Sequence, residues 1–145
     1  MEKTINEMKL ELPSLSVNEG LARSVVAAFC AQADPTAIDV ADVKCAVSEA
    51  ITNCIVHGYK GRVGTVYITL KLYADKKVRI TIKDKGCGIE DVARARTPLF
   101  TTDAENERSG MGFTVMESFS DNIKVYSRIG EGTRVVMYKR LKGRR

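Results

Sequence analysis

Hydrophobic residues recur along this chain at two spacings, one typical of strands and one typical of helices. The alternation in Lys9-Leu10-Glu11-Leu12 predicts a first strand. A helix is expected next, because Ser16 and Glu19 have the spacing of a capping box. Its buried stripe would consist of Leu21, Val25 and Phe29. We expect this helix to stop at the breaker Asp34-Pro35 and to carry Arg23 on its other face.

A second and longer helical pattern runs from about Asp39 to His57, and Gly58 is expected to end it. The buried stripe of this helix would consist of Val43, Val47, Ala50, Ile51, Cys54 and Ile55. Glu49 and Asn53 flank that stripe and lie four residues apart. Side chains at this spacing share one face of a helix, so these two polar groups should lie close together.

Strands are predicted again in the middle of the chain. Residues 66–73 and 78–84 alternate in polarity, and Asp75-Lys76-Lys77 between them is typical of a hairpin turn. The periodicity is then lost from residue 85 to residue 112, apart from one short helix expected near residues 91–95. Loops of this length in a compact domain are usually functional.

The last part of the chain predicts a short helix from residue 112 through Met116, then strands at 123–127 and 134–138 around a turn at 130–132. The order of elements is therefore strand, two helices, two strands, loop, helix and two strands. This order favours an α/β two-layer sandwich, with helices on one face of a largely antiparallel, mixed sheet. No linker divides the 145 residues, so we expect a single domain over residues 1–145.

The composition, with 44% hydrophobic and 28% charged residues, is that of an ordinary globular protein. No apolar run approaches the roughly 20 residues of a membrane span, and no signal-peptide pattern is present. We therefore expect a cytoplasmic protein with no membrane partner. The cysteines are scattered singly and only one histidine is present, which favours reduced thiols over a zinc site or a disulfide framework.

The net charge of +5 is concentrated partly at the C-terminus, in residues 139–145. Such a basic segment could contact nucleic acid or could be a solvated tail. No stacking aromatic residues or groove-reading motif accompany it, so the solvated tail is favoured and no direct nucleic-acid partner is expected.

A glycine-flanked acidic residue gives the first indication of chemistry. The run Asp84-Lys85-Gly86-Cys87-Gly88 follows a predicted strand, and its glycines would let the backbone approach a ligand closely. Together with Glu49 and Asn53 it outlines a magnesium-nucleotide site. Other nucleotide-binding motifs are excluded by missing residues. No P-loop run is present, a Rossmann fingerprint would need a glycine at Asp91, and eukaryotic-type protein kinase signatures are absent.

Four motifs together resemble the ATP-binding fold shared by DNA gyrase, heat-shock chaperones and sensor histidine kinases. They match that family's N box, two glycine boxes and final box, and they are residues 49–58, 84–89, 110–113 and 130–133. The resemblance covers nearly the whole chain. The small size and the lid from Pro98-Leu99-Phe100-Thr101-Thr102 to Arg108-Ser109-Gly110-Met111-Gly112 look like the anti-sigma serine kinases. More narrowly, the chain looks like the sporulation members of that family, with a general-stress anti-sigma kinase as the alternative.

The resemblance implies a role for each residue around the phosphates. Asn53 would offer its side-chain oxygen to Mg²⁺ and thereby to ATP or ADP, because Mg²⁺ is a hard cation that takes oxygen ligands. Glu49 would be the catalytic base that accepts the proton of a serine hydroxyl. Gly110 and Gly112 would present backbone N–H groups to the phosphates at a helix start. Arg108 would stabilise the transferring γ-phosphoryl group.

On the base side of the nucleotide, the resemblance implies that Asp84 accepts a hydrogen bond from the adenine amino group. Thr133 would reach the same edge of adenine, and Gly86 and Gly88 would keep the floor of the pocket open. His57 has two interpretations, since a histidine at a helix end commonly stabilises the dipole, whereas a catalytic role would need it to face the substrate.

The resemblance also implies protein partners. They are a sigma factor of the sporulation type, an anti-anti-sigma protein as phosphorylation substrate, and a second copy in a homodimer. Arg23 resembles the exposed helix arginine with which this family holds its partners, although a merely solvated arginine is equally compatible with the sequence. A non-enzymatic module, in which ATP only orders the lid, is the alternative to a kinase.

Two other activities of the wider superfamily are disfavoured. Sensor histidine kinases need a phosphoacceptor histidine on a separate helix, and the only histidine here lies inside the nucleotide motif. Gyrase-type ATPases need a further transducer domain, which 145 residues cannot hold.

Overall fold

The computed structural model describes residues 3–92, 96 and 112–142. These residues form a five-stranded sheet in which every pair of neighbouring strands is antiparallel. In spatial order the strands are β1 (Thr4–Pro13), β2 (Thr65–Tyr73), β3 (Lys77–Asp84), β5 (Gly132–Arg140) and β4 (Asn122–Arg128). The helices are α1 (Val17–Cys30), α2 (Ala37–Thr52) and α4 (Gly112–Ser118), with a 3₁₀ turn η1 (Ala31–Ala33) and a π-helical turn η2 (Asn53–Gly58).

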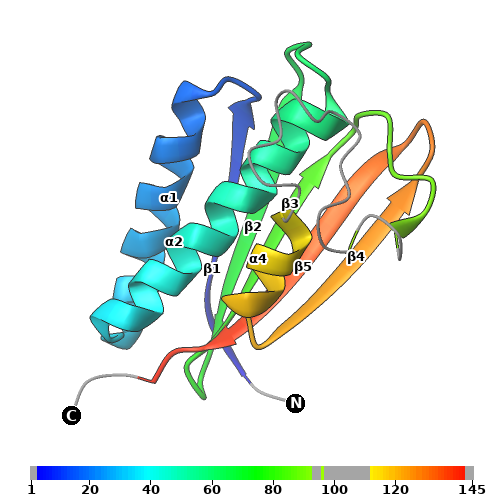
Figure 1. Ribbon diagram of the computed structural model, residues 1–145. Coiled ribbons are helices and arrows are strands. Elements are labelled where there is room, and N and C mark those ends of the chain that lie inside the picture. The colour runs from blue at the N-terminus through cyan, green and yellow to red at the C-terminus, as the bar shows by residue number, and fades with distance from the viewer. Residues whose placement is uncertain (1–2, 93–95, 97–111, 143–145) are drawn as a thin grey trace.

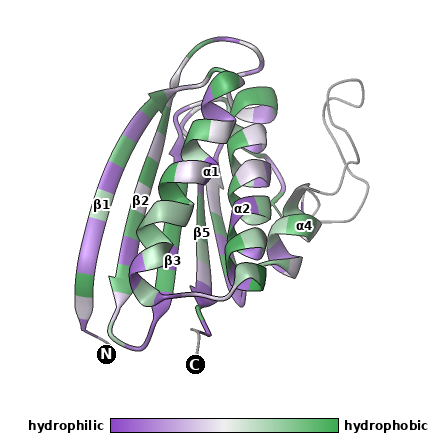
Figure 2. Ribbon diagram, turned by 90° about the vertical axis from the view of Figure 1, so that its left-hand side faces the viewer, coloured by the Kyte–Doolittle hydropathy of each residue, from purple (hydrophilic) through white to green (hydrophobic). Residues whose placement is uncertain are grey.

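All three α-helices lie on one face of the sheet (Figure 1), and the opposite face is not covered by them (Figure 2). This arrangement confirms the predicted α/β two-layer sandwich. None of the helices within the described residues combines the length and the apolar composition needed to cross a membrane.

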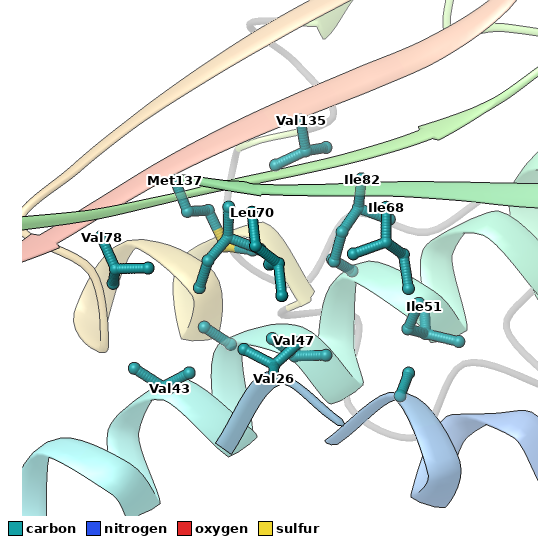
Figure 3. Close-up of a cluster of buried hydrophobic side chains, with 14 of the residues drawn as sticks. Val26, Val43, Val47, Ile51, Ile68, Leu70, Val78, Ile82, Val135 and Met137 are labelled. Carbon is teal, nitrogen blue, oxygen red and sulfur yellow. The ribbon is translucent and has the colours of Figure 1, made fainter. Parts of the chain in front are cut away.

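The core fills the space between the helices and the sheet (Figure 3). The core forms because buried and more exposed residues alternate along β2 and β3, so that every second side chain points toward α1 and α2. Its labelled members are Val26, Val43, Val47, Ile51, Ile68, Leu70, Val78, Ile82, Val135 and Met137. Burying each such side chain contributes about 1.5–3 kcal/mol, which makes this layer the main source of stability.

The first helix differs from its prediction in two respects. Its buried residues are Ala22, Val26, Phe29 and Cys30. Only Phe29 of the predicted stripe is among them, and Leu21 is 49% exposed. The capping box is also wrong. Ser16 already has helical dihedrals and its side chain makes no cap bond, while the Glu19 carboxylate binds the Arg23 guanidinium at 2.9 Å instead. Packing between α1 and α2 therefore overrides the hydrophobic spacing and the capping-box pattern from which the helix was predicted.

The predicted stripe of the second helix is confirmed, with Ile55 only partly buried against the core. The helix begins earlier than predicted because the Thr36 hydroxyl caps it, accepting the Asp39 N–H at 3.1 Å. Its end was predicted at His57, but the α-helix stops at Thr52 and continues as the π-helical turn η2. There, the Tyr59 N–H donates to the Cys54 carbonyl oxygen, five residues earlier, at 2.8 Å.

The predicted hairpin and the two C-terminal strands are confirmed. The hairpin turn contains Lys76 at φ 69°, whose N–H donates to the Tyr73 carbonyl at 2.9 Å. β1 is longer than predicted, because its pairing with β2 continues from Pro13 back to Thr4, beyond the alternating segment. Most of the short helix predicted near residues 91–95 lies outside the described residues.

Candidate functional site

The end of α2 positions two of the predicted site residues. Glu49 lies in the last turn of α2, and Asn53 is the first residue of η2. Both side chains are half-buried, and their spacing places them on the same side of the helix. The change to π-helical bonding begins at Asn53 itself. Single π-turns of this kind are frequent at functional sites.

The loop after β3 packs directly onto the end of η2. The Cys87 N–H donates to the Gly58 carbonyl oxygen at 2.9 Å. A Cβ atom at Gly86 would lie only 2.1 Å from that same oxygen, and a Cβ at Gly58 would lie 2.7 Å from Oδ2 of Asp84. Both positions therefore require glycine, because the N box and the first glycine box touch here through their backbones.

Asp84 is the polar centre of this contact and is 1% exposed. Its Oδ1 accepts the N–H of Gly86 at 2.9 Å and the N–H of Thr133 at 3.3 Å. Its Oδ2 is buried and has no hydrogen-bond partner within the described part of the chain. Burial raises the pKa of this carboxyl, and the N–H of Gly86, the Cys54 thiol and the N–H of Thr133 oppose that shift.

A buried acceptor without a donor costs about 1–3 kcal/mol, so Oδ2 of Asp84 favours a ligand that supplies an N–H group. The amino group of adenine is a donor of this kind. The unsatisfied oxygen of Asp84 is compatible with the predicted hydrogen bond to adenine, which stays a prediction.

Thr133 is buried beside Asp84, and its hydroxyl lies 2.8 Å from the hydroxyl of Ser127. Ser127 also accepts the Ile89 N–H at 2.7 Å and lies 3.0 Å from the Gly132 carbonyl oxygen. Ser127 therefore joins β4, β5 and the first glycine box, a role that the sequence analysis missed. No sequence pattern indicates this role, because the pairing of Ser127 with Thr133 across the two strands is set by the fold.

Gly88 and Gly132 bring backbone segments together in the same region. Gly88 has φ +78°, and a Cβ there would lie 2.2 Å from the Arg128 carbonyl oxygen. Gly132 has φ +107°, and a Cβ there would lie 2.1 Å from the Asp84 carbonyl oxygen. Because both glycines have left-handed backbone conformations and no room for a side chain, they fix how the glycine box packs on β4 and β5.

Tyr59 is a second residue that the sequence analysis missed. Its hydroxyl donates to the Thr65 carbonyl at 2.6 Å and accepts the Lys85 N–H at 2.8 Å. Burial raises the pKa of this phenol, while the bond from Lys85 opposes the shift. A Cβ at Gly64 would lie 2.3 Å from the Tyr59 ring, so the ring is enclosed. Tyr59 therefore ties η2 to the start of the glycine box.

Arg23 was predicted on the face of α1 away from the core, and this placement needs correction. Its Nη1 lies 2.9 Å from Oε1 of Glu19 and 2.9 Å from the hydroxyl of Ser48 on α2. The Thr52 hydroxyl donates to Oε2 of the same Glu19 at 3.3 Å. The Arg23 side chain therefore connects α1 to α2, and at 37% exposed it still reaches solvent. Ser48 and Thr52 directly precede Glu49 and Asn53 along the chain.

The remaining predicted residues belong to the segment before α4. Arg108 and Gly110 lie outside the described residues, as does most of the predicted lid. Gly112 is the first residue of α4, and Phe113 and Met116 bury this helix against α2. The start of α4 therefore lies on the helical face of the sheet, beside the helix that carries Glu49 (Figure 1).

The described part of the chain offers no cluster of protein ligands for Mg²⁺. Among the described residues, no group of three or more His, Cys, Asp or Glu side chains could hold a metal ion. Proteins commonly bind Mg²⁺ through one or two protein oxygens together with phosphate oxygens and water. A half-buried asparagine oxygen suits a site of this kind. Asn53 has this chemistry, so the residues present are compatible with a nucleotide-bound Mg²⁺.

Comparison with known proteins connects this geometry to a family. A family described as histidine kinase-like ATPase domains matches residues 12–139. A protein of Thermoanaerobacter sp. named anti-sigma F factor is 54% identical over 140 residues, which cover 96% of each chain. The anti-sigma F factor of Clostridium perfringens (strain 13) is 48% identical, with 94% of this chain and 97% of that protein covered.

Among solved structures, the RsbU and RsbW domains of a Mycobacterium tuberculosis protein superpose with a TM-score of 0.67 at 18% identity. The superposition covers 94% of this chain and 32% of that one. At this identity the likeness concerns the fold, and it agrees with the antiparallel sheet and one-sided helical layer described above.

Proposed function

Because the chain belongs to the anti-sigma F factors, within the histidine kinase-like ATPase domain family, we propose that it is an anti-sigma factor and an ATP-dependent serine protein kinase. In this proposal it binds a sporulation sigma factor and keeps it from RNA polymerase. It also phosphorylates an anti-anti-sigma protein on serine. The observation that carries the proposal is the buried Oδ2 of Asp84, which receives no hydrogen bond from the described residues and lies at the contact between the N box and the first glycine box.

Adenine recognition would rest on Asp84 and Thr133. The adenine amino group would donate to Oδ2 of Asp84, which satisfies the only oxygen of that carboxylate left without a donor by the described residues. Thr133 is held next to Asp84 by its own N–H bond to Oδ1, so its position depends on the same carboxylate. Gly86 and Gly88 would form the floor beneath the base.

Phosphoryl transfer would occur at the end of α2. Asn53 would hold Mg²⁺, which when bound neutralises charge on the phosphate oxygens. Glu49 would accept the proton of the substrate serine as its oxygen attacks the γ-phosphorus. The bond between the γ-phosphorus and the β-γ bridging oxygen then breaks, and ADP leaves. Gly110 and Gly112 would bind phosphate oxygens through backbone N–H groups, and Arg108 would stabilise the γ-phosphoryl group.

The two protein partners would be controlled by the same reaction. A phosphoserine adds about −1.5 to −2 charges to the contact surface of the anti-anti-sigma protein and weakens its grip on the kinase. The kinase is then free to hold the sigma factor. Arg23 would contact these partners, and its partly exposed guanidinium beside Glu19 supports this assignment. We place the reaction in the cytoplasm, with residues 1–145 acting as one domain in a homodimer.

The test is intact-mass analysis of a purified anti-anti-sigma protein after incubation with this protein and Mg-ATP. We expect the partner to gain the mass of one phosphate with the wild type and to remain unmodified with Glu49→Gln. Fragmentation of the modified partner then locates the phosphate on serine. A matched variant, Glu90→Gln, changes an exposed carboxylate in the glycine-box loop and should retain activity.

The alternative, a nucleotide-gated module without kinase activity, predicts a different result. The partner's mass would never change, although ATP binds and the sigma factor is still captured. Undiminished sigma-factor binding by Glu49→Gln would agree with both proposals, so only the mass of the partner separates them.

A further inference from the structure

The part of the sheet formed by β3, β5 and β4 is positively charged on the face opposite the helices. On β3, β5 and β4 the core residues alternate with residues that point away from the helices. The cations at these outward positions, which we call the basic face, are Lys77, Arg79, Lys83, Lys124, Arg128, Arg134 and Arg140. None of the outward positions on these three strands holds Asp or Glu.

Among the residues that the structure describes, carboxylates neutralise only the two ends of the basic face. Arg128 lies 3.6 Å from Glu131 in the turn between β4 and β5, and Arg140 lies 2.7 Å from Asp75 in the hairpin turn. The other five cations have no carboxylate partner among the described residues. The centre of the face is therefore more positive than its rim.

The register of the strands brings like charges together. Lys83 lies directly opposite Arg134, and Lys77 lies directly opposite Arg140. Like charges at directly paired positions of an antiparallel sheet are destabilising. A partner that supplies carboxylates between such cations would relieve this repulsion, whereas water and salt only screen it.

The tyrosines on this side of the sheet help to identify the class of partner. Three of them lie under cations, with ring centroids 4.9, 5.8 and 4.5 Å away in the pairs Lys85 and Tyr67, Lys124 and Tyr138, and Arg134 and Tyr126. Proteins that bind single-stranded nucleic acid stack bases on bare aromatic rings. Here a lysine or arginine already covers each of these rings. The surface can therefore attract a partner by its positive charge, but these rings are not free to stack on bases.

We propose that the basic face binds an acidic segment of a protein partner, through its carboxylates. This surface is separate from the site of the proposed kinase reaction, because Asp84 lies on the same face of β3 as the core residues and packs against Gly58. A partner could therefore occupy the basic face while nucleotide is bound. The inference stands independently of the kinase proposal.

The test is fluorescence anisotropy with a labelled synthetic peptide of alternating glutamate and alanine, at low salt and saturating Mg-ATP. Mg-ATP occupies the nucleotide site, so the peptide's carboxylates cannot bind there in place of phosphates. The wild type should bind the peptide, and added salt should weaken the complex. The triple variant Lys83→Gln, Arg134→Gln and Lys124→Gln should bind about tenfold more weakly, because it can no longer form three ion pairs with the peptide.

A matched triple variant keeps the total charge of the first but alters other surfaces, through Lys44→Gln, Arg62→Gln and Lys142→Gln. It should bind the peptide like the wild type. A cooperative thermal unfolding transition of the basic-face variant would show that it is folded. Equal losses in both variants, or no binding by the wild type, would overturn the proposal. Tighter binding of oligothymidylate than of the peptide would overturn the choice of an acidic protein.

Discussion

Gly58 lies so close to Asp84 that a Cβ atom at position 58 would be 2.7 Å from Oδ2 of the carboxylate. The two residues come from different motifs, one at the end of η2 and the other at the end of β3. Their contact joins the segment that carries Glu49 and Asn53 to the proposed adenine-binding carboxylate. The absence of a side chain at Gly58 therefore allows the Asp84 carboxylate to pack against the end of η2.

Gly58→Ala should lower the free energy of unfolding by about 1–3 kcal/mol, because the new methyl group overpacks a buried contact. It should also weaken ATP binding, since the Asp84 carboxylate must move. Urea unfolding and calorimetric titration measure the two effects. Gly20→Ala is the control: it lies within α1, with its nearest neighbouring atom 3.5 Å from the new Cβ. This helical substitution should raise stability by about 0.5–1 kcal/mol. Equal stability of Gly58→Ala and the wild type would contradict the contact.

The raised pKa of Asp84 gives stability a defined dependence on pH. Burial makes the folded protein hold this proton to a higher pH than the unfolded chain, whose carboxyl has the ordinary pKa of 3.8. The contribution of Asp84 to stability is therefore greatest below that value and is lost as the pH rises through the folded pKa. Asp84→Asn does not titrate, so its stability relative to the wild type should increase over this interval. Urea unfolding of both proteins as a function of pH measures the difference. A constant difference would show that the Asp84 carboxyl is not desolvated.

Alkylation of the cysteines should map the bound nucleotide. Cys30 and Cys54 are buried, and burial raises the pKa of the Cys30 thiol to about 12 and that of Cys54 well above its ordinary value. Iodoacetamide at mildly alkaline pH should therefore modify only the exposed Cys45 and Cys87. Mg-ATP should protect Cys87, in the first glycine box, and leave Cys45 reactive. Peptide mass spectrometry reads both positions, and equal protection of the two thiols would argue against a nucleotide at this loop.

Arg23→Ala should weaken sigma-factor binding by roughly tenfold or more, because an interface arginine that loses its contacts commonly costs about 2 kcal/mol. Its effect on stability should stay within about 1 kcal/mol, since the ion pair with Glu19 is partly exposed. Lys44→Ala is the matched control, because it removes one positive charge from an exposed position of the neighbouring helix α2. Surface plasmon resonance with immobilised sigma factor compares the two variants, and identical affinities would exclude Arg23 from the interface.

Sequence periodicity predicted the sheet well, because strict alternation in β2 and β3 reflects burial on one face only. It predicted the stripe of α1 poorly. Leu21 and Val25 have helical spacing, but the small residue Ala22 and its neighbour Val26 face α2 instead. Helix packing thus selected a face one residue away from the most apolar positions. The π-helical turn at Asn53 was also missed, since it is associated with a backbone contact between Gly58 and Cys87 that is distant in sequence.

For the candidate site, the sequence identified residues with reactive or ligand-binding side chains, such as Asp84. The spacing of the motifs indicated that these residues would lie close together in the fold. The sequence did not identify Tyr59 and Ser127, which hold the loops in place by hydrogen bonds to backbone atoms. Such residues have no characteristic spacing, because their partners are set by the tertiary fold. Arg23 shows the same limit, since its bond to Ser48 depends on how α1 and α2 pack.

The most direct test of the central claim, that Asp84 recognises adenine, is calorimetric titration of the wild type and Asp84→Asn with Mg-ATP and Mg-GTP. The wild type should prefer ATP, because guanine presents an acceptor where adenine presents its amino donor. Asp84→Asn should bind ATP roughly ten- to a hundredfold more weakly, from loss of a hydrogen bond to a charged group. It should also lose the preference over GTP, whereas Asp42→Asn should behave like the wild type. Unchanged affinity and selectivity in Asp84→Asn would contradict the account.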